Sequence, residues 1–424
     1  MDRGHLSRVS RFGLSGVILI CLMPSVLAQK TYTWQELREK FENSNPTLKA
    51  AQENVTETRA QEITAYLRPN PDLSFGVDQI EPFVTNPYYR PFGQAEPTAS
   101  FDYLHERKHK RELRLEAAKQ GTLIAQSQLE DQRRTLLFSL RNAYVQLLQA
   151  KAIFAQAKEN LAQYDKVIDV NRDRQKAGDI AQVDFDRIEL QRVQFESDLQ
   201  TADVNARTAK INLLTLLNER TPIDQFDVTG TFDFGESIEP LEELRRQALE
   251  ARPDLQAAAE TVDQARTNYR LAVANGSTDP TFGFDIGRNP PSLSQYIGFS
   301  VSIPLRIFDK NQGEKARTAV DIRRNQRLLD ANQAQVFSDV DSAYATLNST
   351  LVLLKPYKDH YLAQATRIRD TINFSYQHGA ASLLDLLQAQ QDYRATEVNY
   401  LNLIGSYLTA ASQLNMAVGR EVVQ

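Results

Sequence analysis

Residues 376–385 read Tyr-Gln-His-Gly-Ala-Ala-Ser-Leu-Leu-Asp, and they lie between two long helical patterns. A glycine followed by small residues is typical of a tight turn between helices. Residues 175–184 read Gln-Lys-Ala-Gly-Asp-Ile-Ala-Gln-Val-Asp, and both stretches place an aspartate six residues after the glycine. The two glycines are 201 positions apart, about half of the chain. We interpret the stretches as the tips of two coiled-coil hairpins in a duplicated chain.

The composition of the 424 residues favours long helices over several globular domains. Ala, Glu, Leu, Gln and Arg dominate most of the chain, whereas Gly and Pro cluster in a few places. Charged residues make up 24% of the chain and the formal net charge is −5. This charge gives no electrostatic case for binding nucleic acid.

The first 28 residues have the pattern of a signal peptide. Arg3, Arg8 and Arg11 form a basic start, residues 14–23 form a short apolar core, and residues 26–28 read Val-Leu-Ala. We expect cleavage after Ala28. A membrane anchor is the alternative, but the apolar run is well under the 18 residues that a spanning helix needs.

The only cysteine, Cys21, lies inside this segment. Lipidation of Cys21 would need a small residue before it, and Ile20 stands there. The mature chain therefore has no cysteine, which excludes disulfides and thiolate metal sites.

Each half of the chain is predicted to contain helices, two strands and a long helical hairpin. Leu73, Phe75 and Val77 alternate with small or polar residues, as do Phe282, Phe284 and Ile286, and this period of two indicates strands. Helices are predicted at 35–67 with a break at 45–46, 106–176, 183–217, 241–274 with a break at 252–253, 314–378 with a kink or restart at Pro356, and 382–418. The strands are predicted at 73–77, 98–103, 280–286 and 295–303, and loops at 80–96 and 289–292.

An internal repeat connects the two halves. Corresponding residues keep an offset of 200 to 209 positions over most of the chain, which argues for a duplication. We therefore divide the chain into a signal peptide (1–28), a first repeat (29–221), an extended equatorial segment (222–240) and a second repeat (241–424). The matched residues are Pro46 and Pro253, Pro71 and Pro280, Tyr144 and Tyr344, Gly178 and Gly379, Asp184 and Asp385, and Leu213 and Leu414.

Two strands per half cannot form a stable sheet alone. Exposed strand edges do not survive in lipid, so the four strands of one chain would have to close with copies from other chains. A trimer would supply 12 strands, a sensible number for a membrane β-barrel. The helices would continue this barrel as a periplasmic tube, so the predicted fold is mainly α-helical with a membrane β-barrel part.

Two further motifs carry a family resemblance over residues 30–420. Residues 251–255 read Ala-Arg-Pro-Asp-Leu, and residues 303–313 read Ile-Pro-Leu-Arg-Ile-Phe-Asp-Lys-Asn-Gln-Gly. Together with the two tip turns, they resemble TolC-type outer-membrane efflux proteins. The resemblance implies a homotrimer in the bacterial outer membrane, with a 12-strand barrel and a long α-helical barrel in the periplasm.

The function implied by this resemblance is passive export. Substrate driven by an inner-membrane pump would enter through a periplasmic adaptor and leave through the barrel, without a cofactor. Residues 308–313 resemble members that work with resistance–nodulation–division pumps, including metal exporters. A duct for type I protein secretion is the alternative within the family, and a periplasmic coiled-coil scaffold or adaptor is the alternative outside it.

The resemblance also assigns roles to tip residues. Asp385 matches the acidic ring of the periplasmic constriction, where three like charges would favour cations and raise the pKa of the carboxyls. Gln388 stands where some members have a second acidic residue. Asp184 and Tyr376 match a pair that links neighbouring coiled coils in the closed state. The residues that match the adaptor-contact turns are Gly178, Ile180, Ala181, Gly379, Ala380 and Leu383.

Each of these assignments has a simpler alternative. Asp184 and Asp385 could complement a helix dipole, the glycines could only form turns, and Tyr376 could be a packed seam residue. The basic run at 107–111 could be a solvated helix start or could contact anionic head groups. His105 and His109 have the spacing of metal ligands on a helix, but no third ligand is evident, and no enzyme motif stands out.

Overall fold

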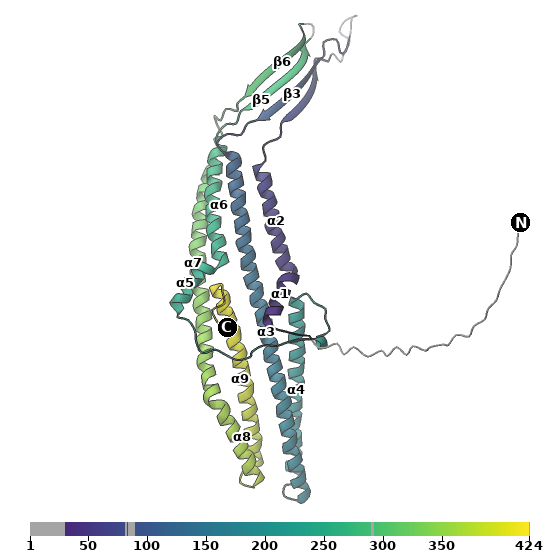
Figure 1. Ribbon diagram of the computed structural model, residues 1–424, viewed down its shortest axis with the longest axis vertical. Coiled ribbons are helices and arrows are strands. Elements are labelled where there is room, and N and C mark those ends of the chain that lie inside the picture. Colours follow the sequence, from purple (N-terminus) through teal and green to yellow (C-terminus); the bar gives the residue numbers. More distant parts are fainter. Residues whose placement is uncertain (1–29, 81–82, 84–89, 290–291, 424) are drawn as a thin grey trace, which may run out of the picture.

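The computed structural model describes residues 30–80, 83, 90–289 and 292–423, so the predicted signal peptide lies outside the described residues. An elongated helical body carries a β-sheet at one end and, at the other, the two tight turns that each join a pair of helices (Figure 1). The first half contains β1 (Lys30–Tyr32), α1 (Trp34–Ser44), α2 (Pro46–Tyr66), β2 (Asp72–Asp78), β3 (Glu96–Leu104), α3 (Lys110–Ala177) and α4 (Gln182–Leu216).

The second half has the same general order. A 3₁₀ turn (Ile223–Gln225) and β4 (Phe226–Val228) come first. None of the described helices is both long enough and apolar enough to cross a lipid bilayer. The remaining elements are α5 (Leu241–Ala251), α6 (Pro253–Asn275), β5 (Thr281–Asn289), β6 (Leu293–Ser302), α7 (Gln312–Pro356), a π-helical turn (Tyr357–Tyr361), α8 (Leu362–Gln377) and α9 (Leu383–Val418).

The predicted helix breaks are confirmed, because a proline opens the second helix at each of them. Asn45 ends α1, and its side-chain oxygen accepts a hydrogen bond from the backbone N–H of Leu48 at 3.0 Å. Pro46 then occupies the first position of α2, where its missing N–H costs nothing. Pro253 opens α6 in the same way after Arg252.

The start of α3 differs from the prediction. The helix begins at Lys110 rather than near residue 106, because Lys108 and His109 adopt left-handed backbone conformations with φ of 60° and 56°. Lys110 is buried and its Nζ lies 2.5 Å from Asp279 Oδ2, so a solvated start is wrong for this residue. His105 and His109 both precede the helix, so the predicted ligand spacing on a helix is also wrong.

The four long strands form one antiparallel sheet in the order β2-β3-β5-β6. In the cross-strand register Leu73 pairs with Phe101, Phe101 with Phe284, and Phe284 with Phe299. The apolar residues of all four strands therefore lie on one face, and that face is exposed; Phe299 is 84% exposed. Asp102 and Asp285 lie on the opposite face among serines and glycines.

The helices form two layers that share α3 and α7, because α7 contacts both α6 and α9. Next to the sheet, α3 contacts α2 and α6, and α6 contacts α7. Toward the turns, α3 contacts α4 and α9, and α9 contacts α8 (Figure 1). The outermost helices are therefore α2 and α4 on one side and α7 and α8 on the other.

The apolar core lies where the two layers meet. Leu140 and Leu147 of α3 are buried there in one cluster, and Ile404 and Leu414 of α9 in a second. The segment after β4 crosses this region and is held by two tyrosines: the Tyr144 hydroxyl donates to the Thr229 carbonyl at 2.8 Å, and the Tyr407 hydroxyl donates to the Gly235 carbonyl at 2.9 Å. The parallel pair β1–β4 was not predicted.

Pro356 marks the irregularity that the sequence predicted in the long second helix. It ends α7, and a π-helical turn of five residues separates it from α8. Proline has no N–H for the helical hydrogen bond and its ring crowds the preceding turn, so the register of the backbone hydrogen bonds changes there.

Candidate functional site

The two hairpin tips share one backbone geometry. Gly178 and Gly379 have φ of 86° and 74°, a left-handed conformation that favours glycine. One residue later, the N–H of Asp179 donates to the Arg174 carbonyl at 2.9 Å, and the N–H of Ala380 donates to the Ser375 carbonyl at 2.8 Å. Both glycines are therefore at least turn formers that close the end of a helix.

The helices after the two tips begin differently. At the second tip, the Ser382 hydroxyl accepts from the Asp385 N–H at 3.2 Å and the Ser382 N–H donates to Asp385 Oδ2 at 3.0 Å, which forms a capping box. The Ser382 hydroxyl also donates to Asp385 Oδ2 at 2.7 Å. These hydrogen bonds lower the pKa of Asp385 below its usual value. At the first tip, Ala181 offers no side-chain cap, and Asp184 lies 3.6 Å from Arg187. In one chain, both aspartates thus occupy helix starts.

The predicted closed-state pair, Asp184 and Tyr376, lies near the tips, and a third residue, Arg174, contacts Tyr376. Tyr376 is buried, and its hydroxyl makes no hydrogen bond to Asp184 in the described part of this single chain. The Arg174 guanidinium lies 5.1 Å from the centroid of the Tyr376 ring and donates to the Tyr376 carbonyl at 3.5 Å. Burial raises the pKa of Tyr376, and the charge of Asp184 raises it further.

Arg174 is a residue that the sequence prediction missed. It comes from the last turn of α3 and reaches α8, so it joins the first hairpin to the second. In the sequence Arg174 is a basic residue in the last turn of a helix. Such a residue is expected there merely because it complements the helix dipole, so it did not stand out.

The predicted adaptor-contact residues divide into two groups. Gly178, Ala181, Gly379 and Ala380 are exposed, whereas Ile180 and Leu383 are partly buried against the cluster inside the first hairpin. The exposed apolar side chains at the tips are instead Val183 (57% exposed) and Leu384 (74% exposed). Val183 and Leu384 are also 201 positions apart, so the internal repeat could have identified them. Gln388 is exposed and donates to Asp392 at 2.8 Å.

A buried polar cluster joins the two hairpins farther from the tips. Glu397 of α9 accepts hydrogen bonds from Gln156 at 2.7 Å, from Asn160 at 3.3 Å and from the Tyr393 hydroxyl. Burial raises the pKa of Glu397, although these bonds act in the other direction. Arg369 of α8 lies 3.9 Å above the Tyr393 ring and extends the cluster to a third helix. The sequence prediction missed this cluster because its members are about 240 positions apart.

The described residues contain no group of three or more His, Cys, Asp or Glu side chains that could hold a metal ion. The tips instead offer exposed carboxylates and apolar side chains, which suit ion passage and protein contact.

Comparison with known proteins shows what the chain is similar to. Residues 244–420 match the family described as "Outer membrane efflux protein". The cobalt-zinc-cadmium resistance protein CzcC of Cupriavidus metallidurans is 23% identical over 378 residues, which cover 89% of this chain and 87% of CzcC. The pyoverdine export outer membrane protein OpmQ of Pseudomonas putida is 23% identical over 406 residues, which cover 91% of this chain and 85% of OpmQ.

Solved structures show the same fold. CusC, described as forming a transmembrane channel, superposes with a TM-score of 0.76 at 19% identity and covers 91% of this chain and 92% of its own. The outer membrane protein VceC of Vibrio cholerae superposes with a TM-score of 0.74 at 16% identity and covers 92% of this chain and 96% of its own. The relatives are efflux and channel proteins rather than enzymes. The resemblance drawn from the tip turns is thereby confirmed: residues 244–420 match the outer-membrane efflux protein family, relatives that align with about nine-tenths of the chain include an outer-membrane export protein, and solved outer-membrane channels share its fold.

Proposed function

We propose that three copies of this chain close their sheets into one 12-stranded barrel. The observation that carries the proposal is the two-faced sheet, which exposes a continuous apolar face. Within the described chain, β2 and β6 each pair along one edge only, so both outer edges need partners. Sister subunits supply such partners without leaving an edge in the membrane. The apolar face then contacts outer-membrane lipid.

The polar face lines the duct of this barrel and is acidic. Asp72, Asp78, Asp102 and Asp285 share that face in the strand register, and in β2, β3, β5 and β6 it carries no lysine or arginine among the described residues. A narrow passage lined by carboxylates favours cations over anions. We expect the duct to conduct cations preferentially.

The helices extend the duct into the periplasm. The outermost helices, α2 and α4 on one side and α7 and α8 on the other, pack against those of the neighbouring subunits. This arrangement follows from two repeats, residues 29–221 and 241–424, that are joined by the equatorial segment 222–240. Each chain would then contribute two hairpins to the closed tip.

At the tip, three copies of Asp385 form the constriction. In one chain Ser382 lowers the pKa of Asp385, whereas three like charges near one axis would raise it. Gln388, one turn further along α9, keeps the constriction uncharged at that level. Asp184 and Tyr376 hold neighbouring hairpins together, and the tips splay when this contact breaks.

The partners are a periplasmic adaptor and an inner-membrane pump. We propose a pump of the resistance–nodulation–division type, which rests on the resemblance of residues 308–313. The adaptor contact is formed by exposed tip residues: Gly178, Ala181, Val183, Gly379, Ala380 and Leu384. Ile180 and Leu383 pack beneath this surface, against the apolar cluster of the first hairpin. A type I secretion duct would share this geometry, whereas a periplasmic scaffold or adaptor would not need the exposed apolar sheet.

Loss of the closed-state pair should open the tip. The double variant Asp184→Ala with Tyr376→Phe is expected to raise single-channel conductance severalfold in planar bilayers, because it removes the carboxylate and the phenol that hold the hairpins. Asp186→Ala is the matched control, since Asp186 accepts a hydrogen bond from Gln182 of its own helix at 2.7 Å. Unchanged conductance in the double variant would count against the lock.

A further inference from the structure

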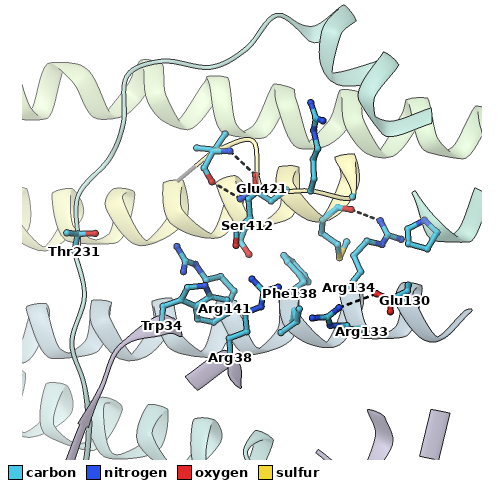
Figure 2. Close-up of a pocket in the computed structure, with 17 residues that line it drawn as sticks. Trp34, Arg38, Glu130, Arg133, Arg134, Phe138, Arg141, Thr231, Ser412 and Glu421 are labelled. Atoms are coloured by element: carbon cyan, nitrogen blue, oxygen red, sulfur yellow. Dashed lines mark hydrogen bonds and ion pairs between the residues drawn. The ribbon is translucent and has the colours of Figure 1, made fainter. Parts of the chain in front are cut away.

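A cleft of about 530 Å³ lies at the middle of the molecule, between α1, α3 and the end of α9 (Figure 2). Five arginines line it, but only two glutamates, Glu130 and Glu421, do so. Trp34 and Phe138 contribute aromatic walls. The cleft is therefore rich in arginine and partly apolar, and its volume suits a small organic molecule.

Four of the five arginines already have polar partners. Arg38 and Arg133 lie 3.2 Å and 2.8 Å from Glu42 Oε1. The Arg134 guanidinium lies 2.6 Å from Asp131 Oδ1, and Arg420 donates to Gln247 at 3.2 Å. Their guanidinium groups therefore already interact with other residues of the protein. The fifth arginine, Arg141, differs from them.

Arg141 makes no hydrogen bond and no ion pair with any residue that the structure describes. Its guanidinium lies 4.6 Å from the Trp34 ring centroid and 5.7 Å from that of Tyr144, so it is held against two aromatic faces. Burial lowers the pKa of Arg141, and Glu421 is the one carboxylate whose charge opposes this effect without reaching ion-pair distance. Figure 2 labels Arg141, Trp34 and Glu421 around the same cleft.

A partly buried cation without a counter-ion is costly, and a bound anion would compensate it. Guanidinium matches a carboxylate in particular, because its planar donors can meet both oxygens. Phe138, Leu137 and Trp34 would contact the remainder of the ligand, and they favour an apolar body.

We propose that this cleft binds a small organic carboxylate, with its oxygens on Arg141 and its apolar body against Trp34 and Phe138. The site goes beyond the export duct, because it is a separate cleft in the middle of the helical layers. Its walls come from α1, α3, the segment after β4, Pro253 at the start of α6, the end of α9 and the residues that follow it. The outermost helices of the described chain, α2, α4, α7 and α8, do not line it.

Trp34 provides a direct readout, because it is the only tryptophan in the sequence. The detergent-purified full-length protein is titrated with 4-phenylbutyrate while the Trp34 emission is recorded. We expect a saturable change. 4-Phenyl-1-butanol, which has the same body without the charge, should give no saturable change, and acetate should bind more weakly than 4-phenylbutyrate.

Variants test the assignment to Arg141. Arg141→Gln should raise the half-saturating concentration of 4-phenylbutyrate about tenfold or more, because a charge-assisted hydrogen-bonded pair is lost. Arg133→Gln is the matched control in the same cleft, and it should leave that concentration within about twofold because Glu42 and Glu130 already pair with Arg133. If Arg141→Gln does not assemble, Arg141→Lys keeps the charge without the planar donors and should bind severalfold more weakly.

Three results would overturn the proposal. The first is an absence of saturable change with 4-phenylbutyrate in the unaltered protein. The second is equal binding by the phenylbutanol, which would show an apolar pocket only. The third is unchanged binding in the Arg141 variants. A response to an acidic peptide but not to 4-phenylbutyrate would also reject the small ligand in favour of a protein partner.

Discussion

Replacement of Arg252 by alanine is expected to lower the free energy of unfolding by about 3–5 kcal/mol. The Arg252 side chain is only 5% exposed. Its guanidinium lies 2.6 Å from Asp254 Oδ2 and 2.8 Å from Asp339 Oδ2, and it donates to the Ala417 carbonyl at 3.3 Å. It thus ties the start of α6 to α7 and to the end of α9. Without it, Asp254, Asp339 and the Ala417 carbonyl each lose this partner.

Chemical denaturation in detergent, followed by the loss of helical signal, would measure this effect. Arg246→Ala is the matched control, because Arg246 forms ion pairs with Glu243 and Glu250 on an exposed face of α5. We expect the control to change stability little, since exposed pairs are screened by water. Equal shifts for the two variants would contradict the role of Arg252.

Replacement of Tyr164 by alanine is expected to cost about 3–5 kcal/mol of local stability in the first hairpin. Tyr164 is 1% exposed, and its ring stacks on Phe195 with centroids 4.4 Å apart. Its hydroxyl donates to the Ile188 carbonyl at 2.9 Å. This residue is central to the small cluster that holds the lower part of α3 against α4.

Hydrogen exchange of the amides in 185–195 would report the loss. Tyr164→Phe keeps the ring and removes one hydrogen bond, so it should cost only about 1 kcal/mol. If the alanine and phenylalanine variants exchanged alike, the stacked ring would not be what stabilises the hairpin.

The packing of the two hairpins differs in a way that bears on gating. In α4 the residues Phe185, Ile188 and Phe195 are buried, whereas Tyr376 is the one buried residue among those described in α8. The π-helical turn after Pro356 lies directly above α8. Because fewer apolar contacts hold it, the second hairpin is expected to move more readily than the first.

Local signals account for the parts of the fold that the sequence predicts. Pro46 and Pro253 each begin a new helix because proline cannot continue the preceding one, and glycine at 178 or 379 closes a helix because the backbone there needs a positive φ. The alternation of apolar residues is also a local signal, because successive side chains of a strand point to opposite faces of a sheet. These signals need no knowledge of distant residues.

Contacts between distant residues explain what the sequence did not predict. β1 and β4 are three residues each, too short for a periodic pattern, and they exist because they pair with each other. The same holds for Arg174, Arg141 and Glu397. In the sequence they look like ordinary helical residues, because residues that they contact are far away along the chain. Asp385 was identified by the repeat, but its hydrogen bonds to Ser382 in one chain do not reveal what three copies would do together.

The central claim is that the four strands of one chain are completed only by sister subunits. The most direct measurement is the mass of the mature protein after extraction from outer membranes in a mild detergent, by native mass spectrometry. We predict a complex of three chains that dissociates on strong heating. A monomer that stays in solution without detergent would contradict the claim.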